Sequence, residues 1–299
     1  MKYCRMGFEN KNGELGMLKR EEIRIRDPFI YTDTENQCYY MYGTTALDPN
    51  SKRAGNTFSV YKTTDLENFS QAKVIFDGSA SNFWADHDFW APEVHFYKGK
   101  YYLFGSCKAD GRHRATQIFV CDTPDGQFVP LTDAPITPSD WECLDGTLYV
   151  ENNIPYIIFS HEWTQVGDGE FWAMPLSENF THAIGEPFLL FRASDNPNVN
   201  ERRGVPGNYV TDGPFLYYEK GKLNMIWSSF YNGRYLVLRA WSDSLHGSWR
   251  HEGSMFDFDG GHAMLFHRLD GERMISLHAP NIENQERAVF YHFANNARG

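Results

Sequence analysis

Three aspartates stand at the start of strand-like segments that lie far apart in the chain: Asp27, Asp145 and Asp212. Ala91 and His262 begin two further segments of the same kind. Two carboxyl groups on either side of a sugar linkage can hydrolyse it, because one protonates the leaving oxygen and the other activates water or attacks directly. A third carboxylate raises the pKa of the acid and so keeps it protonated near neutral pH. A fold that brings the starts of these segments together would therefore form a site that can hydrolyse a glycosidic bond.

The segments that must position these residues have the two-residue period of β-strands. Five hairpins are expected, with polar turns such as Lys98-Gly99 and Lys220-Gly221. Their first strands include residues 29–31, 94–97, 148–150, 215–218 and 264–266. A further strand-like run follows several of these hairpins, for example residues 116–120.

The hairpins recur at intervals of roughly 50 to 65 residues, which is typical of a propeller repeat. The sequence therefore predicts an all-β fold, a five-bladed β-propeller with four-stranded antiparallel blades around a central channel. A β-sandwich is the alternative, but it does not explain the long-range repeat. We expect one catalytic domain over residues 1–299, with residues 1–24 as an N-terminal extension or as a segment that closes the propeller.

Composition restricts the ligand. The 299 residues include 8 Trp, 17 Tyr and 23 Phe, and 28 Lys and Arg against 39 Asp and Glu give a net charge of −11. Nucleic acid is excluded as a partner, because phosphate binding needs a basic surface. A neutral carbohydrate, held by stacking and hydrogen bonds, suits this composition better.

The chain shows no apolar run of membrane-spanning length, so no membrane association is expected. Residues 1–24 lack the apolar core of a signal peptide. Two possibilities are left open: the protein is cytoplasmic, or it is periplasmic or secreted and its leader has been removed. The five cysteines are scattered without a Cys-x-x-Cys pair, and buried free thiols are expected. The oligomeric state is left open.

Aromatic side chains near the hairpin starts are candidates for stacking on a sugar ring. Trp84, Phe89 and Trp90 precede the second hairpin. The alternative for each of them is packing between blades.

Several motifs together resemble glycoside hydrolase family 43, the five-bladed propeller arabinofuranosidases, xylosidases and arabinanases. Residues 26–30 (Arg-Asp-Pro-Phe-Ile) resemble the family's opening motif, and residues 90–94 (Trp-Ala-Pro-Glu-Val) its second-blade signature. Residues 145–149 (Asp-Gly-Thr-Leu-Tyr) and the pair Gly261-His262 are similar to its third-blade and fifth-blade motifs. The ordered set spans about residues 24 to 290.

The resemblance implies a role for each carboxyl group. Asp27 would be the general base, Asp145 would raise the pKa of the acid and orient it, and Asp212 would be the acid. The family usually has Glu-Gly-Pro at the acid position, whereas this chain has Asp212-Gly213-Pro214. Two alternatives follow from this shortening: a nearby glutamate (Glu142, Glu170 or Glu201) is the acid, or the protein binds sugar without cleaving it.

The resemblance also implies that His262 lies in the channel beside a water or a calcium ion. Because calcium prefers oxygen ligands, His262 would act on it only through water. No cofactor is otherwise required. Arg287 matches an arginine that contacts the sugar in the family.

The expected function is that of an inverting glycoside hydrolase that removes terminal arabinofuranosyl or xylosyl units from plant polysaccharide fragments. A non-catalytic carbohydrate-binding propeller is the second hypothesis, and a protein-interaction propeller is the third. The sugar, the linkage and the choice between terminal and internal cleavage are not determined by the sequence.

Overall fold

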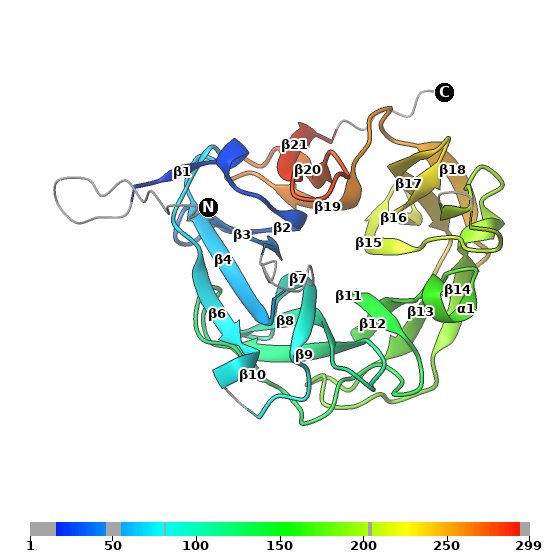
Figure 1. The fold of residues 1–299 in the computed structure, drawn as a ribbon, viewed down its shortest axis with the longest axis horizontal. Helices are drawn as coiled ribbons and strands as arrows, with labels where there is room; N and C mark the ends of the chain where they lie inside the picture. The colour runs from blue at the N-terminus through cyan, green and yellow to red at the C-terminus, as the bar shows by residue number, and fades with distance from the viewer. Residues whose placement is uncertain (1–15, 46–54, 81, 203–204, 294–299) are drawn as a thin grey trace, which may run out of the picture.

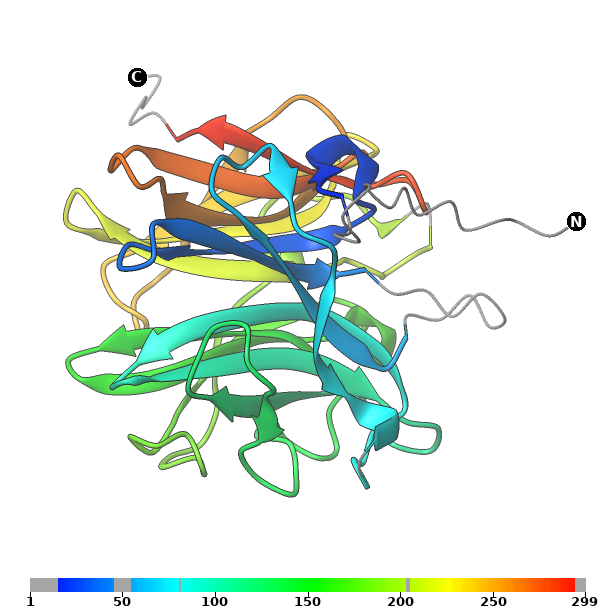
Figure 2. The ribbon, with the colours of Figure 1, turned by 90° about the vertical axis from the view of Figure 1, so that its left-hand side faces the viewer.

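The computed structural model describes residues 16–45, 55–80, 82–202 and 205–293. Within these residues the chain forms five antiparallel sheets. The sheets stand around a common centre like the blades of a propeller, and the colour in Figure 1 passes around the ring in chain order. Figure 2 shows the same blades from the side. The predicted five-bladed β-propeller is therefore confirmed.

Blades two, three and four each have the predicted four strands, in the order of the sequence. Blade two contains β7 (His87–Tyr97), β8 (Lys100–Lys108), β9 (Ala115–Cys121) and β10 (Val129–Pro130). Blade three contains β11 (Cys143–Glu151), β12 (Ile154–His161), β13 (Glu170–Pro175) and β14 (Phe188–Arg192). Blade four contains β15 (Asp212–Glu219), β16 (Lys222–Tyr231), β17 (Arg234–Ser242) and β18 (Arg250–Ser254).

Blades one and five differ from the predicted four strands. Blade one is a six-stranded sheet of β1 (Leu18–Lys19), β2 (Arg26–Asp33), β3 (Cys38–Thr44), β4 (Thr57–Thr63), β5 (Asn68–Phe69) and β6 (Lys73–Asp77). In blade five the described residues form three strands, β19 (Gly261–His267), β20 (Arg273–Ala279) and β21 (Arg287–His292). The helical segments are short: α1 (Trp163–Val166) and the 3-10 turns η1 (Arg20–Glu22), η2 (Gly78–Ala80) and η3 (Ala193–Asp195).

The core lies between the blades, where large apolar side chains from neighbouring sheets meet. Phe171 of blade three, for example, packs edge-on against Trp227 of blade four, with 5.7 Å between ring centroids. Most of the aromatic residues serve this packing, as blades with two apolar faces require. Four of the cysteines lie in the described part of the chain, and all four are free. No helix among the described residues is long and apolar enough to cross a membrane.

Candidate active site

The inner strand of each blade carries the same irregularity near its start. In β2 the pairing with β3 advances from Arg26↔Thr44 to Phe29↔Tyr42, so three steps on one strand match two on the other. The inner strands of the other four blades show the same shift. One extra residue of this kind forms a β-bulge, which bends the strand and redirects a side chain.

A left-handed backbone conformation marks the bulge in every blade. The residues with positive φ are Asp27, Ala91, Asp145, Gly213 and His262, with φ between 46° and 55°. Non-glycine residues adopt this conformation at a cost, and they are found where function or packing compensates for it. The repeat in the sequence thus corresponds to a repeated backbone distortion that points one residue per blade at the channel.

The amide of each bulge residue is bonded to the preceding blade. The N–H groups of Ala91, Asp145 and His262 donate to the hydroxyl oxygens of Thr44, Ser106 and Ser228, at 2.8–2.9 Å. Asp27 N–H donates to Nδ1 of His278 at 3.3 Å. Each blade therefore fixes the functional residue of the next blade.

Blade four departs from the expected placement of the third aspartate. Its bulge position is filled by Gly213, and Asp212 lies one residue earlier, in the slot that Arg26 occupies in blade one. The placement of Asp212 in the same slot as Asp27 and Asp145 was therefore wrong. A side chain does not fit at the bulge here, because a Cβ on Gly213 would lie 2.8 Å from the ring of His262.

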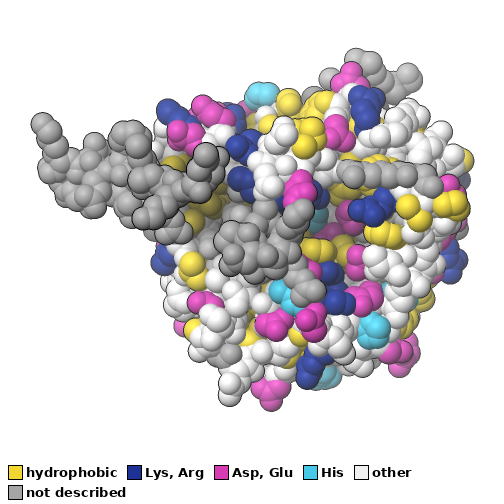
Figure 3. All heavy atoms as spheres, in the orientation of Figure 1, with side chains coloured by type: hydrophobic (Ala, Val, Ile, Leu, Met, Phe, Trp, Pro, Cys, Tyr) yellow, Lys and Arg dark blue, Asp and Glu magenta, His cyan; other side chains and the backbone are white. Residues whose placement is uncertain are grey.

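Asp27, Asp145, Asp212 and His262 nevertheless line one pocket of about 550 Å³. Most of the residues that line the pocket are polar or charged, and they come from all five blades. They include Arg24, Arg26, Asp88, Trp90, Glu162, Trp163, Arg202, Phe230, Tyr235, Asn281, Glu283 and Glu286. Figure 3 shows acidic, basic and histidine side chains together near the middle of one face of the molecule. The tertiary structure thus brings together the four residues that the sequence singled out.

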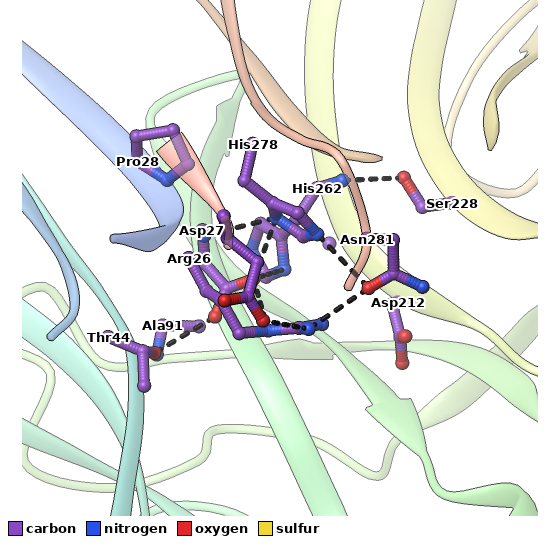
Figure 4. Close-up of polar contacts among 12 residues, drawn as sticks. Arg26, Asp27, Pro28, Thr44, Ala91, Asp212, Ser228, His262, His278 and Asn281 are labelled. Carbon is purple, nitrogen blue, oxygen red and sulfur yellow. Dashed lines mark hydrogen bonds and ion pairs between the residues drawn. The ribbon is translucent and has the colours of Figure 1, made fainter. Parts of the chain in front are cut away.

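Asp27 is buried and surrounded by partners for a negative charge. Thr44 donates its hydroxyl to Oδ2 at 2.9 Å, and Nδ1 of His262 lies 3.3 Å from Oδ1. Figure 4 shows Asp27 among His262, His278 and Arg26. Burial alone would raise the pKa of Asp27, but His262, then His278 and Arg26, outweigh it and hold the pKa well below its usual range. The surroundings of Asp27 therefore favour its ionised form.

Asp145 approaches the same nitrogen of His262 as Asp27 does, with 3.7 Å between its Oδ2 and Nδ1. The same oxygen accepts the N–H of Gly213 at 2.9 Å, so Asp145 is bonded to the residue that follows Asp212. Burial and the negative charge of Asp27 raise the pKa of Asp145 well above its usual range. Asp145 is thus placed to influence both the position of Asp212 and its charge.

Asp212 begins β15 and has one polar partner among the described side chains. The hydroxyl of Tyr235 donates to its Oδ2 at 2.9 Å. Burial, and then the charge of Asp145, raise the pKa of Asp212 to about 7, against the opposing effects of Tyr235, His262 and Arg26. One pocket therefore holds an ionised carboxylate and a carboxyl group that keeps its proton near neutrality.

Of the three aromatic residues predicted to stack on a sugar, one lines the pocket. Trp90 lines the pocket, and the guanidinium of Arg114 lies 3.5 Å from the centre of its ring. Phe89 is buried and packs on Phe58 and Phe76 in the core, so its assignment to the sugar was wrong.

Trp84 is also absent from this pocket. It lines a second hollow beside η2 and β10, and its indole N–H donates to Gln117 at 3.0 Å. The prediction that Trp84 stacks on the sugar beside the aspartates was wrong. Trp84 is close to Trp90 in the sequence, but its side chain lies on the outside of the blade.

Arg287 lies away from the pocket as well. Its Nε donates to the backbone oxygen of Glu21 at 2.6 Å, and its Nη1 donates to that of Glu286 at 2.9 Å. The bond to Glu21 joins β21 to the N-terminal segment. The expected sugar contact is therefore wrong, and the arginines that line the pocket are Arg24, Arg26 and Arg202.

None of the three glutamates considered as substitute acids lines the pocket. Glu142 is paired with Lys108, Glu170 is paired with Arg192, and Glu201 accepts the N–H of Gly207. Glu162 lines the pocket instead, where burial raises its pKa and Arg114 opposes the effect. Four residues were proposed from the sequence as the general acid: Asp212, Glu142, Glu170 and Glu201. Of these, Asp212 lines the pocket.

Sequence reasoning missed Tyr235 and Asn281. Nothing in the hairpin repeat marks them, since Tyr235 lies on the third strand of its blade and Asn281 in the loop after β20. Asn281 accepts Nη1 of Arg26 at 3.0 Å (Figure 4). Arg26 itself was within reach of the sequence, because it precedes Asp27 in the opening motif.

A calcium ion in the channel finds no matching set of ligands. In the described part of the chain, no three His, Cys, Asp or Glu side chains are arranged to hold a metal ion. Nδ1 of His262 faces the carboxylates of Asp27 and Asp145. We therefore derive no step through a metal.

Comparisons with known proteins agree with this geometry. The sequence model of glycosyl hydrolases family 43 matches residues 22–292. An endo-arabinase from Bacteroides thetaiotaomicron VPI-5482 is 38% identical, with coverage of 95% of this chain and 99% of its own, and its structure superposes with a TM-score of 0.85.

More distant structures share the fold. An endo-1,4-beta-xylanase from the same organism is 22% identical over 95% of this chain and 94% of its own, with a TM-score of 0.74. An alpha-L-arabinofuranosidase from Lactobacillus brevis is 17% identical over 92% of each chain, with a TM-score of 0.73. No curated protein matches the sequence.

Proposed function

This chain belongs to glycosyl hydrolases family 43, and from this premise we propose that it hydrolyses arabinofuranosyl or xylosyl linkages of plant polysaccharides with inversion at the anomeric carbon. Asp27 is the general base, Asp212 the general acid, and Asp145 the residue that orients the acid and raises its pKa.

The observation that carries this proposal is one pocket that holds Asp27 against His262 and Thr44, and Asp212 against Tyr235, with Asp145 bonded to the residue after Asp212. These surroundings shift the two carboxyl pKa values in opposite directions. Asp27 is held ionised, and the pKa of Asp212 is raised to about 7. Acid and base catalysis by two carboxyl groups requires such a difference, because one must give a proton while the other accepts one.

The reaction then proceeds as a single displacement. The Asp27 carboxylate takes a proton from a water molecule, and the water oxygen forms a bond to the anomeric carbon. The bond from that carbon to the leaving oxygen breaks, and Asp212 gives its proton to this oxygen. The products are the sugar with inverted configuration and a free hydroxyl on the leaving group.

Arabinofuranosyl linkages are the preferred substrate in this proposal. The support is the neighbour at 38% identity, which is named an endo-arabinase. The sequence-based expectation is removal of terminal units, whereas that name describes internal cleavage, so the cleavage pattern is part of the test.

The test is product analysis with linear arabino-oligosaccharides and xylo-oligosaccharides. We expect a faster release from arabinan fragments, inverted anomeric configuration in the first product by NMR, and loss of turnover by about a hundredfold or more in Asp27→Asn. Monosaccharide as the sole early product indicates terminal cleavage, and a ladder of short products indicates internal cleavage. Binding by calorimetry without any product would contradict hydrolysis and support the non-catalytic propeller.

A further inference from the structure

Tyr235 is the side chain that holds the acid of the proposed reaction. It lies on β17, the third strand of blade four, and 3% of its surface is exposed. Its hydroxyl donates to Oδ2 of Asp212 at 2.9 Å. Among the described side chains, no other donor bonds to this carboxyl group.

The backbone around Tyr235 is fixed on both sides. Its N–H donates to Oδ1 of Asp259 at 3.0 Å, and its carbonyl oxygen accepts the N–H of Gly260 at 2.9 Å. Oδ2 of Asp259 accepts the N–H of Asn281, a pocket residue, at 3.0 Å. Asp259 therefore connects the strand of Tyr235 to the loop that contacts Arg26.

The fold also keeps space for the tyrosine ring. A Cβ on Gly261 would lie 2.3 Å from that ring, which no real structure tolerates. Residue 261 starts the inner strand of blade five, in the slot that holds Arg26, Trp90 and Asp212 in other blades. Blade five has a glycine and so no side chain in this slot, and the ring of Tyr235 occupies the space.

The same ring also contacts a residue that supports Asp27, the proposed base. It stacks on His278 with 5.9 Å between centroids and 16° between planes, and Nδ1 of His278 accepts the N–H of Asp27. One rigid ring thus lies between the residue that supports the base and the carboxyl group of the acid.

We propose that Tyr235 is a positioning residue that adapts this site to an aspartate acid. The inference rests on the proposed function. An aspartate reaches less far than the usual glutamate, so its carboxyl group must be held at one angle to deliver a proton. Because the hydroxyl of Tyr235 donates to Oδ2, the acidic proton is kept on Oδ1, the oxygen left free for the leaving group.

The proposal fixes the direction of a pH shift. The groups that face Asp212 are Tyr235 from β17, Asp145 from β11, His262 from β19 and Arg26 from β2. The hydrogen bond from Tyr235 favours the ionised form of Asp212. Tyr235→Phe removes that bond and keeps the ring, so the alkaline limb of the activity profile should move to higher pH while kcat falls about tenfold to a hundredfold.

The experiment compares two leaving groups. A nitrophenyl arabinofuranoside leaves with little help from an acid, whereas an arabino-oligosaccharide needs the proton. We expect Tyr235→Phe to lose more kcat on the oligosaccharide than on the aryl substrate, with KM changed less than twofold. Asp212→Asn provides the reference for complete loss of the acid. Tyr218→Phe, an exposed tyrosine of the same blade, is the matched control and should behave as the wild type.

The outcomes separate the inference from the proposed function. If Asp212→Asn loses oligosaccharide turnover and Tyr235→Phe keeps the wild-type rate and pH profile, the inference fails and the function stands. If Asp212→Asn also keeps the wild-type rate, the acid assignment itself fails. If Tyr235→Phe does not fold, Asp259→Asn loosens the same strand without removing the hydroxyl. It should give the same leaving-group dependence to a smaller degree, and an unchanged profile there would overturn the inference.

Discussion

At the scale of single residues, the surroundings of Asp27 and Asp212 shift the pKa of the same side chain in opposite directions. Both lie in the same pocket, and burial raises the pKa of both. Asp27 is contacted by His262, His278 and Arg26, and these lower its pKa below that of a free carboxyl group. For Asp212, the charge of Asp145 acts in the same direction as burial and raises the pKa. The difference comes from neighbours and not from the side chain itself.

If Asp212 is the general acid, as proposed, its pKa sets the alkaline limit of activity. The proposed reaction needs Asp212 protonated and Asp27 ionised, so kcat/KM should stay level through mildly acidic pH and fall above about pH 7 as Asp212 loses its proton. The measurement is a pH profile on arabino-oligosaccharide between about pH 4 and 9. A profile that stays level across this range would contradict the assignment of Asp212.

The same shift predicts how stability depends on pH. The folded protein holds the proton of Asp212 up to about pH 7, whereas the unfolded chain releases it near the ordinary carboxyl pKa. Stability therefore declines as the pH rises between those two values. Asp212→Asn removes this penalty, so the Tm of the variant relative to wild type should be higher at pH 8 than at pH 5. An equal Tm difference at both pH values would indicate that the group is not shifted.

At the scale of elements, the bulge at the start of each inner strand is the unit that builds the site. It turns a side chain toward the channel, and the preceding blade fixes it through a hydrogen bond to its amide. Blade four keeps the bulge but fills it with Gly213, which leaves room for the ring of His262. With glycine at the bulge, the acidic side chain of blade four lies one residue earlier, at Asp212.

Gly213→Ala tests this arrangement. A Cβ at residue 213 would press on His262, and His262 contacts both Asp27 and Asp145. We expect kcat to fall by about tenfold or more, because a small misplacement of catalytic groups is costly. Gly221→Ala is the matched control, since Gly221 also has positive φ (76°) but has no neighbour within 4 Å of an added Cβ. Equal losses of activity in both variants would show that backbone strain, and not contact with His262, causes the effect.

At the scale of the whole molecule, the ends of the described chain meet at the junction of blades one and five. Ile25 donates its N–H to the carbonyl oxygen of Glu286, and the buried carboxylate of Glu286 contacts Arg24 and Arg26. Arg287 bonds to Glu21 in the same region. The closure of the ring and one wall of the pocket therefore share residues.

Arg287→Ala should weaken the closure and leave the chemistry intact. Losing two hydrogen bonds to backbone oxygens costs about 1 to 3 kcal/mol, which we expect to lower Tm by a few degrees. The KM for arabino-oligosaccharide should stay within about twofold of wild type, since Arg287 does not line the pocket. Arg268→Ala, which removes half-exposed ion pairs of the same blade, serves as the control and should change Tm little. A large rise in KM for Arg287→Ala would instead indicate that Arg287 contacts the sugar, as the sequence suggested.

The sequence by itself determined the repeat and most of the residues at the channel. Strand period and turn residues are local properties, so the five hairpins and the aspartates that open them could be recognised without a fold. The placement of Asp27, Asp145 and His262 followed from that repeat.

The tertiary structure decided what depends on register and on packing between blades. Gly213 takes the bulge position in blade four, so Asp212 lies one position earlier than Asp27 and Asp145 do in their blades. A turn places Trp84 on an outer surface, while the nearby Trp90 lines the pocket. Tyr235 reaches Asp212 from a strand that carries no motif. The pKa difference between Asp27 and Asp212 also arises only there, because it depends on charges that distant segments bring within a few ångströms.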